Sequence, residues 1–295
     1  MSSKKIILVL LLSSMFSSVL FAQNKDSLTS KKTDISTKKF YYQIGIGYNF
    51  NSGIGSFSNN TKNADGSTSK QLFRASLGKG FDIAFSLGKK ITQNFGLEME
   101  LGYILGSANT ENNQFYETNF GNPLTVKQRV EYTANTFRIN PKFLFEVPFA
   151  KGNAFYSKIG YMIGFGNAKT TISEDWYFVN GSTGNGNYTR ARTGGLVSGS
   201  TLALGVRFKL EHDACFFMEF TGNNLHRSFK EDRMTESNEN GKNTLDSKTV
   251  YQTETVFVKN ATTTLNPDQS QPHQYPSYRV SYSTVGFRIG IVKHF

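Results

Sequence analysis

The sequence predicts an all-β protein, an eight-stranded antiparallel up-and-down β-barrel, with ten strands as the alternative count. Two patterns predict it: apolar residues recur at every second position in eight segments, and long polar segments alternate with short turns between them. The composition agrees, because aromatic residues reach 14% and there are 27 glycines in a chain whose mean hydropathy is −0.39. Many aromatic residues and glycines in a polar chain favour strands that face an apolar medium.

The amino terminus has the parts of a secretory signal peptide, which we place at residues 1–22. Lys4 and Lys5 supply the positive charge, an apolar run follows, and a plausible cleavage sequence ends at Ala22. A signal peptide is removed before folding, so this run does not count as a membrane span. Residues 23–38 are polar and rich in Ser, Thr and Lys, and we expect a flexible periplasmic leader there.

Residues 39–295 hold the predicted strands, in which apolar side chains alternate with small or charged ones. The strands are expected at 40–50, 81–88, 95–105, 137–147, 155–165, 201–210, 215–221 and 285–295. Pro141 interrupts the fourth strand and has no N–H to donate. Either a ladder hydrogen bond is missing there or a bulge is present.

The connections between strands alternate in length. Short turns are expected at 89–94, 148–153 and 211–213, whereas four long polar segments, near 51–71, 107–127, 167–198 and 226–277, are expected to be extracellular loops. An even number of strands leaves both chain ends on the side of the short turns, which is the periplasmic side in such barrels. Within the last loop, residues 249–259 look strand-like and form either a hairpin above the membrane or two further strands.

The charged residues of the strands lie on the face opposite the apolar one. They are Asp82, Glu98, Glu100, Arg138, Lys142, Glu146, Lys158, Arg207, Lys209, Glu219 and Arg288. Five acids against six bases suit a narrow interior, because an unpaired buried charge costs several kcal/mol. The apolar faces carry no charge until Lys293, whose long side chain can reach a membrane interface. These faces therefore point outward, and we predict an eight-stranded antiparallel up-and-down transmembrane β-barrel whose lumen is plugged by a salt-bridge network.

Aromatic residues gather in two places along this plan. Next to the short turns, where a membrane girdle is expected, lie Phe95, Phe145, Phe149, Phe155, Phe216 and Phe295. Within the polar loops lie Phe115, Tyr116, Trp176, Tyr177, Phe178, Tyr251 and Phe257. The loop aromatics either grip a partner or pack the loops onto one another, and the sequence leaves both open.

The signal peptide, the eight alternating strands, the rhythm of loops and turns and the final Phe295 together resemble the small bacterial outer-membrane β-barrel family, which includes OmpA-like and porin-like transmembrane barrels. The last strand matches the assembly signal of that family at Arg288, Gly290 and Phe295, and departs from it at Lys293, where a hydrophobic residue is usual. The resemblance implies the cell outer membrane of a Gram-negative bacterium, contact with outer-membrane lipid and lipopolysaccharide, and insertion by the barrel-assembly machinery. The formal charge of +11 suits contact with anionic lipopolysaccharide.

Residues with catalytic or metal-binding spacing are sparse. None of the four histidines has metal-ligand spacing with another histidine or with the lone Cys215, so neither a metal nor a cofactor is expected. His226 and Ser228 are weak catalytic candidates, because a lipid A deacylase family with a similar barrel uses a His, a Ser two residues on and a later Glu. A histidine oriented by a carboxylate activates a hydroxyl for acyl transfer. Here the spacing from this pair to the next glutamates does not match that family.

Function follows less directly than architecture. We expect a structural or surface-interaction role through the extracellular loops, with an extracellular protein or glycan as the ligand and no catalysis. A small porin or transport channel is the alternative, and a lipid A-modifying hydrolase the third. Nucleic-acid binding is not expected, because the strands carry no concentrated stripe of Lys and Arg. The oligomeric state stays open.

Overall fold

The computed structural model describes residues 39–52, 57–62, 68–73, 76–119, 122–149, 152–210, 212–261 and 267–295. The predicted signal peptide and leader lie outside the described residues. Within them the chain is all-β, with one large sheet of fifteen strands and a separate pair, β2 (Phe57–Lys62) and β3 (Thr68–Phe73). The helices, η2 (Leu245–Ser247) and α2 (Val250–Thr253), are single turns. Neither has the length and apolar character needed to traverse a bilayer.

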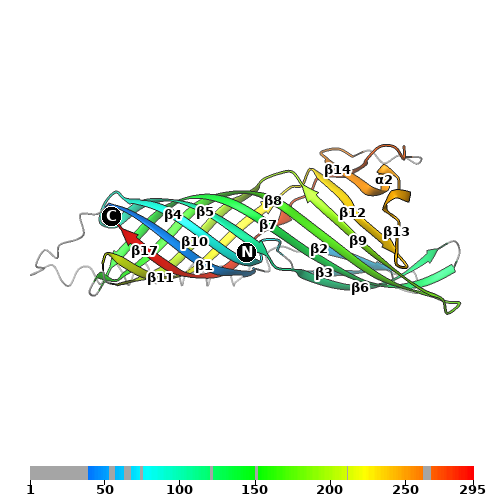
Figure 1. The fold of residues 1–295 in the computed structure, drawn as a ribbon, viewed down its shortest axis with the longest axis horizontal. Helices are drawn as coiled ribbons and strands as arrows, with labels where there is room; N and C mark the ends of the chain where they lie inside the picture. The colour runs from blue at the N-terminus through cyan, green and yellow to red at the C-terminus, as the bar shows by residue number, and fades with distance from the viewer. Residues whose placement is uncertain are drawn as a thin grey trace, which may run out of the picture. The chain divides into compact units, whose positions relative to one another are not determined.

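Eight strands of the large sheet close on themselves through antiparallel pairs, and we call this closed set the ring (Figure 1). In order around the ring they are β1 (Phe40–Asn51), β4 (Gly80–Lys90), β5 (Phe95–Gly106), β7 (Asn122–Pro148), β8 (Ala154–Phe178), β10 (Val197–Lys209), β11 (Ala214–Arg227) and β17 (Thr284–His294). Each of the eight strand positions predicted from the sequence falls in one of these strands, so those predictions are confirmed.

β7 and β8 run well past the ring and carry a second part of the sheet, which we call the extension (Figure 1). Residues 124–135 of β7 and 167–178 of β8 pair with each other there. The other members are β6 (Asn109–Asn119), β9 (Thr183–Thr193), β12 (Glu231–Glu239), β13 (Lys242–Asn243), β14 (Glu254–Val258) and β15 (His273–Pro276). All pairs are antiparallel except β14 with β15. A short strand, β16 (Val280–Ser281), pairs with the end of β11.

The extension corrects the prediction of polar loops. The segments near 107–127, 167–198 and 226–277 are strand over much of their described length, and the segment near 51–71 contains β2 and β3. The sequence pattern did not predict these strands because their hydrophobic alternation is weak. One face is polar and the other mixes apolar with polar residues. The strand-like run at 249–259 is α2 followed by β14, which pairs with β12 and β15. It is therefore neither a hairpin nor a ring strand, and the ring has eight strands.

Pro141 leaves the register of β7 and β8 unchanged. Ile139 pairs with Ile163 and Lys142 with Gly160, and the ladder skips the two residues between. The sequence left two arrangements open at Pro141, a missing ladder hydrogen bond or a bulge. The structure has the first, with no bulge.

Three tight turns join ring strands at one end of the ring. Each is closed by a backbone hydrogen bond, as from Phe149 N to Asn153 O (2.9 Å) and from Leu210 N to Ala214 O (2.8 Å). The start of β1 and the end of the chain lie at the same end, because Phe295 N donates to Phe40 O (2.9 Å). This end is called the turn end.

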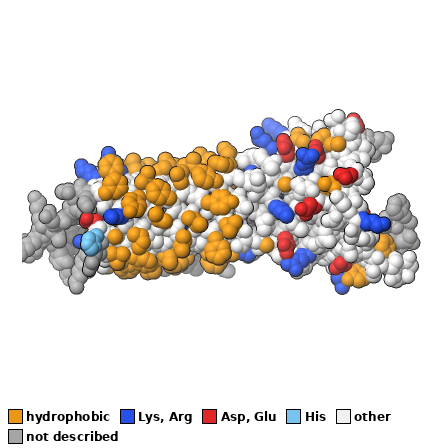
Figure 2. Space-filling view, viewed as in Figure 1, with side chains coloured by type: hydrophobic (Ala, Val, Ile, Leu, Met, Phe, Trp, Pro, Cys, Tyr) orange, Lys and Arg blue, Asp and Glu red, His pale blue; other side chains and the backbone are white. Residues whose placement is uncertain are grey.

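The outer face of the ring is apolar and exposed. Ile46, Phe81, Phe143 and Phe220 are each 58–69% exposed, and Figure 2 shows a continuous apolar belt over the ring strands, with charged side chains over the extension. The alternate residues point inward, so Arg138 and Glu100 are at most 1% exposed. The distribution is the reverse of a water-soluble protein, whose charged side chains face out.

Candidate functional site

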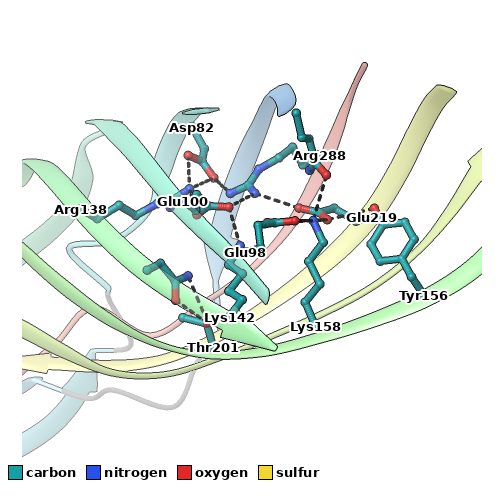
Figure 3. A network of polar contacts seen from close by, with 12 residues as sticks. Asp82, Glu98, Glu100, Arg138, Lys142, Tyr156, Lys158, Thr201, Glu219 and Arg288 are labelled. Atoms are coloured by element: carbon teal, nitrogen blue, oxygen red, sulfur yellow. Dashed lines mark hydrogen bonds and ion pairs between the residues drawn. The ribbon is translucent and has the colours of Figure 1, made fainter. Parts of the chain in front are cut away.

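The charged residues predicted to line the interior meet inside the ring. Ten of the eleven are buried, and each of them forms an ion pair with another member of the set. Figure 3 shows the part of this network around Arg288 and Lys158. Lys209 is the exception and corrects the prediction, because it is the last residue of β10 and its side chain is exposed at the turn end. Without it the interior set holds five acids and five bases, so the charges balance.

Arg288 of β17 is the centre of this network. Its guanidinium lies 2.6 Å from Asp82, 2.8 Å from Glu100 and 2.8 Å from Glu219, which come from three other strands. Arg138 adds a second cation beside Asp82 (2.7 Å) and Glu100 (3.1 Å), and Lys142 also contacts Glu100. Arg288 and Arg138 thus tie opposite walls of the ring together through shared carboxylates.

Lys158 continues the network toward the turn end. Its ammonium lies 3.0 Å from Glu98 and 3.5 Å from Glu219, and it donates to Gln43 (3.0 Å). Two tyrosine hydroxyls also donate hydrogen bonds to these carboxylates: Tyr41 donates to Glu98 and Tyr156 to Glu219, each at 3.0 Å.

Arg207 forms the last step. It contacts the Glu146 carboxylate, which also holds Lys90 at 2.6 Å. The guanidinium lies 4.9 Å from the ring centres of both Tyr41 and Tyr156, a distance at which an aromatic face attracts a cation. Every interior carboxylate therefore has at least one cationic partner.

Sequence reasoning missed the uncharged members of this network. Tyr41 and Gln43 stand on the inward face of β1, and Tyr156 stands on the inward face of β8, in step with Lys158. The alternation that located the charges identifies them as well, since they share its parity. Lys90 also has the inward parity of β4, but it lies in the segment that was predicted to be a turn.

Glycines on the inner wall give these long side chains room. A Cβ at Gly205 would lie 2.4 Å from the ring of Tyr156, and one at Gly102 would lie 2.6 Å from Arg138. Both are closer than real Cβ contacts allow. The glycines are therefore part of the network's geometry.

An apolar cluster closes each end of the charged interior. At the turn end it includes Tyr41, Phe217 and Val292, all fully buried. At the other end a larger cluster contains Leu77, Met162, Val197, Leu225, Phe229, Val280 and Tyr282, with Ala134 and Ala168. Between them, the described residues leave a cavity of about 10 Å³ beside Glu100 and Arg288, roughly the space that one water needs.

Arg227 holds the far cluster in place. It is 1% exposed, and its guanidinium donates to the carbonyl oxygens of Gly166 (2.7 Å) and Gly194 (3.0 Å) and lies 4.7 Å from the Phe229 ring centre. Tyr132 packs against the same cluster. Burial and the nearby Glu111 carboxylate raise the pKa of Tyr132 to about 12, so this phenol stays neutral at any physiological pH.

The extension has its own polar contacts. Asp232 of β12 accepts hydrogen bonds from Arg190 (2.7 Å) and Arg192 (2.9 Å) of β9. Although burial disfavours the charged form, Tyr278 and Asp232 raise the pKa of Arg192 above its usual value. Trp176 donates to Glu174 (3.1 Å), which also accepts from Gln128 (2.7 Å).

The aromatic residues predicted to lie in loops are distributed over the extension. Tyr116 and Tyr177 are exposed, whereas Phe115, Trp176, Phe178, Tyr251 and Phe257 are half-buried. Phe257 packs against Tyr275 and Tyr278, at 6.2 and 5.6 Å between ring centres, and Tyr251 packs against His273 at 4.8 Å.

The weak catalytic candidates are not assembled into a site. His226 is an exposed residue of β11 that pairs with Ser198 and Ser281, and Ser228 follows the end of that strand. No hydrogen bond of the described residues joins His226 to Ser228. Nor does the part of the chain that the structure describes contain a group of three or more residues able to hold a metal ion.

The three residues of the predicted assembly signal have different surroundings. Arg288 belongs to the interior network, Gly290 packs against β1 beside Ile44 and Phe217, and the Phe295 ring stacks on Phe40 at 6.2 Å. No protein-family model matches the chain, and no curated protein matches it.

Proposed function

We propose that this protein is an outer-membrane β-barrel of a Gram-negative bacterium. In this proposal the ring is the membrane anchor, the turn end faces the periplasm, and the extension is a rigid surface module that contacts an extracellular protein or glycan. The role is structural or in surface interaction, and the ring conducts no solute.

One observation carries the membrane assignment: the ring exposes an apolar belt while it buries the ten charged side chains of the interior network. Water would make that arrangement unstable, because each apolar Å² left exposed forgoes about 25 cal/mol. A bilayer removes the penalty for the belt. A closed ring also pairs its backbone groups from strand to strand, as the hydrocarbon requires, apart from the gap in the ladder at Pro141. β1, β4 and β5 have 11 or 12 residues, which is long enough for the roughly 9–11 that a tilted strand needs to cross the bilayer.

The interior argues against the alternative of a small porin. Balanced charges fill it, an apolar cluster lies toward each end, and the cavity beside Glu100 and Arg288 has a volume of only about 10 Å³. The extension supports the surface role, because ladder hydrogen bonds hold it as a sheet beyond the apolar belt and its outer side chains suit water.

The proposal is tested by refolding the mature chain into phosphatidylcholine vesicles and then recording single-channel currents in a planar bilayer. We expect a folded band that migrates differently from the boiled sample on a gel, protection of ring strands from protease, and a silent bilayer. Arg138→Gln serves as the matched variant. Steady openings whose conductance changes in that variant would show a pore through the network, and failure to insert into any lipid would refute the membrane role.

A further inference from the structure

Exposed lysines gather on one side of the turn end of the ring. Lys39, Lys89, Lys209 and Lys293 are exposed at the ends of β1, β4, β10 and β17. Around the ring these strands, with β11 between β10 and β17, are consecutive, so the lysines form one arc. We name these four residues the basic arc. Figure 2 shows basic side chains where the apolar belt stops at this end.

The remaining three strands, β5, β7 and β8, carry aromatic residues at or next to this end. Phe95 and Phe145 pack with their ring centres 5.2 Å apart, and Phe149 stacks on Phe155 at 4.5 Å. These rings belong to the girdle predicted from the sequence, whereas the basic arc was not predicted. Only Lys209 and Lys293 were singled out from the sequence, and the strands at whose ends the four lysines lie are far apart in the chain.

The acids at this end leave the arc positive. Among the described residues they are Asp213, in the turn between β10 and β11, and Glu146, which is already held by Arg207 and Lys90. Lys89 also lies over the Phe40 ring at 5.2 Å, so its ammonium is placed at the edge of the apolar surface. Long basic side chains and aromatic rings at such a border lie at the level of the lipid headgroups, so the Lys89 ammonium can reach a headgroup phosphate.

We propose that the basic arc binds the phosphate groups of anionic phospholipids in the membrane leaflet at the turn end. The inference rests on the proposed membrane role and names the lipid class that one side of the ring selects. Each basic residue near an anionic lipid surface strengthens association about fivefold at ordinary ionic strength. The lysines therefore orient the ring and enrich phosphatidylglycerol beside β10, β11, β17, β1 and β4.

The test uses the full mature chain reconstituted in phosphatidylcholine vesicles that contain a small fraction of spin-labelled phosphatidylglycerol. The measured quantity is the association of labelled phosphatidylglycerol relative to labelled phosphatidylcholine. The test variant carries Lys89→Gln, Lys209→Gln and Lys293→Gln. A matched control carries Lys127→Gln, Lys242→Gln and Lys259→Gln, which remove three exposed lysines from the extension side.

We expect the test variant to lose at least about fivefold in relative association, and the control to stay within twofold of the unmodified protein. High salt should abolish the preference, because exposed charges are screened. Equal preference in all three proteins overturns the proposal. The proposal is also overturned if the test variant keeps its lipid preference but loses binding to isolated peptidoglycan. The basic arc would then bind the carboxylates of that polymer and not lipid phosphates. Insertion into pure phosphatidylcholine is measured first, so a failure of the membrane role is seen separately.

Discussion

Arg288 shows how single residues hold the ring together. It contacts three buried carboxylates, and two of them also have Arg138 as a partner. Removing one member of a buried ion pair is costly because the remaining charges are less well neutralised and have no water to compensate. The network is therefore cooperative: the loss of one cation is felt by several acids.

Arg288→Met tests this cooperativity. We expect the free energy of unfolding to fall by roughly 3–5 kcal/mol, because Asp82, Glu100 and Glu219 each lose a partner. Urea titration in detergent micelles, followed by gel migration, measures the change. Arg129→Met is the control, since its pair with Glu131 is exposed and such pairs contribute about 1 kcal/mol or less. Similar losses in the two variants would contradict a structural role for the network.

Two glycines of the ring provide a matched test of interior space. A Cβ at Gly205 would overlap the Tyr156 ring, whereas nothing lies within 4 Å of a Cβ at Gly222. We expect Gly205→Ala to cost about 1–3 kcal/mol of stability through overpacking. Gly222→Ala should be neutral or slightly stabilising, by up to about 1 kcal/mol, because it restricts the unfolded chain. The same urea titration decides, and equal effects would mean that Tyr156 moves aside freely.

β7 and β8 are the elements that join the two parts of the sheet. Each contributes one half to the ring and the other half to the extension, and they stay paired along nearly their whole length. The extension is therefore joined to the ring by two continuous paired strands and not by a flexible linker. Its other strands are added outward from this pair, and β12 depends on its contacts with β9.

Asp232→Ala tests that dependence. Without the carboxylate, Arg190 and Arg192 lose their shared partner, and we expect the β9–β12 pair to weaken by about 1–3 kcal/mol. Hydrogen exchange of β9 and β12 amides should then quicken about 5- to 150-fold, while the ring strands keep their protection. Glu254→Ala is the control, because its pair with Arg233 is 3.4 Å long and exposed. Faster exchange throughout the ring would show that the two parts unfold together.

At the scale of the molecule, the two faces of the ring have exchanged the roles they have in a soluble protein. The apolar side chains cover the outside, and the inside is a charged core with apolar caps. An eight-stranded ring is narrow enough for side chains to fill, so the same charges that would line a wider channel here neutralise one another. This is the physical basis for the non-conducting anchor that we propose.

The sequence by itself determined the ring strands, the side of each strand that is apolar and ten of the inward charges, because all of these depend on a period of two along a single strand. The tertiary structure alone decided the rest. Arg288 meets Asp82 across 206 positions of the chain, so no local pattern reveals that pair. Lys209 has the inward parity of β10, but as the last residue of that strand it is exposed at the turn end. The polar segments form the extension because the β7–β8 ladder continues beyond the ring. Pairing partners and strand ends are set by long-range contacts, whereas the facing of a side chain is set by its immediate neighbours.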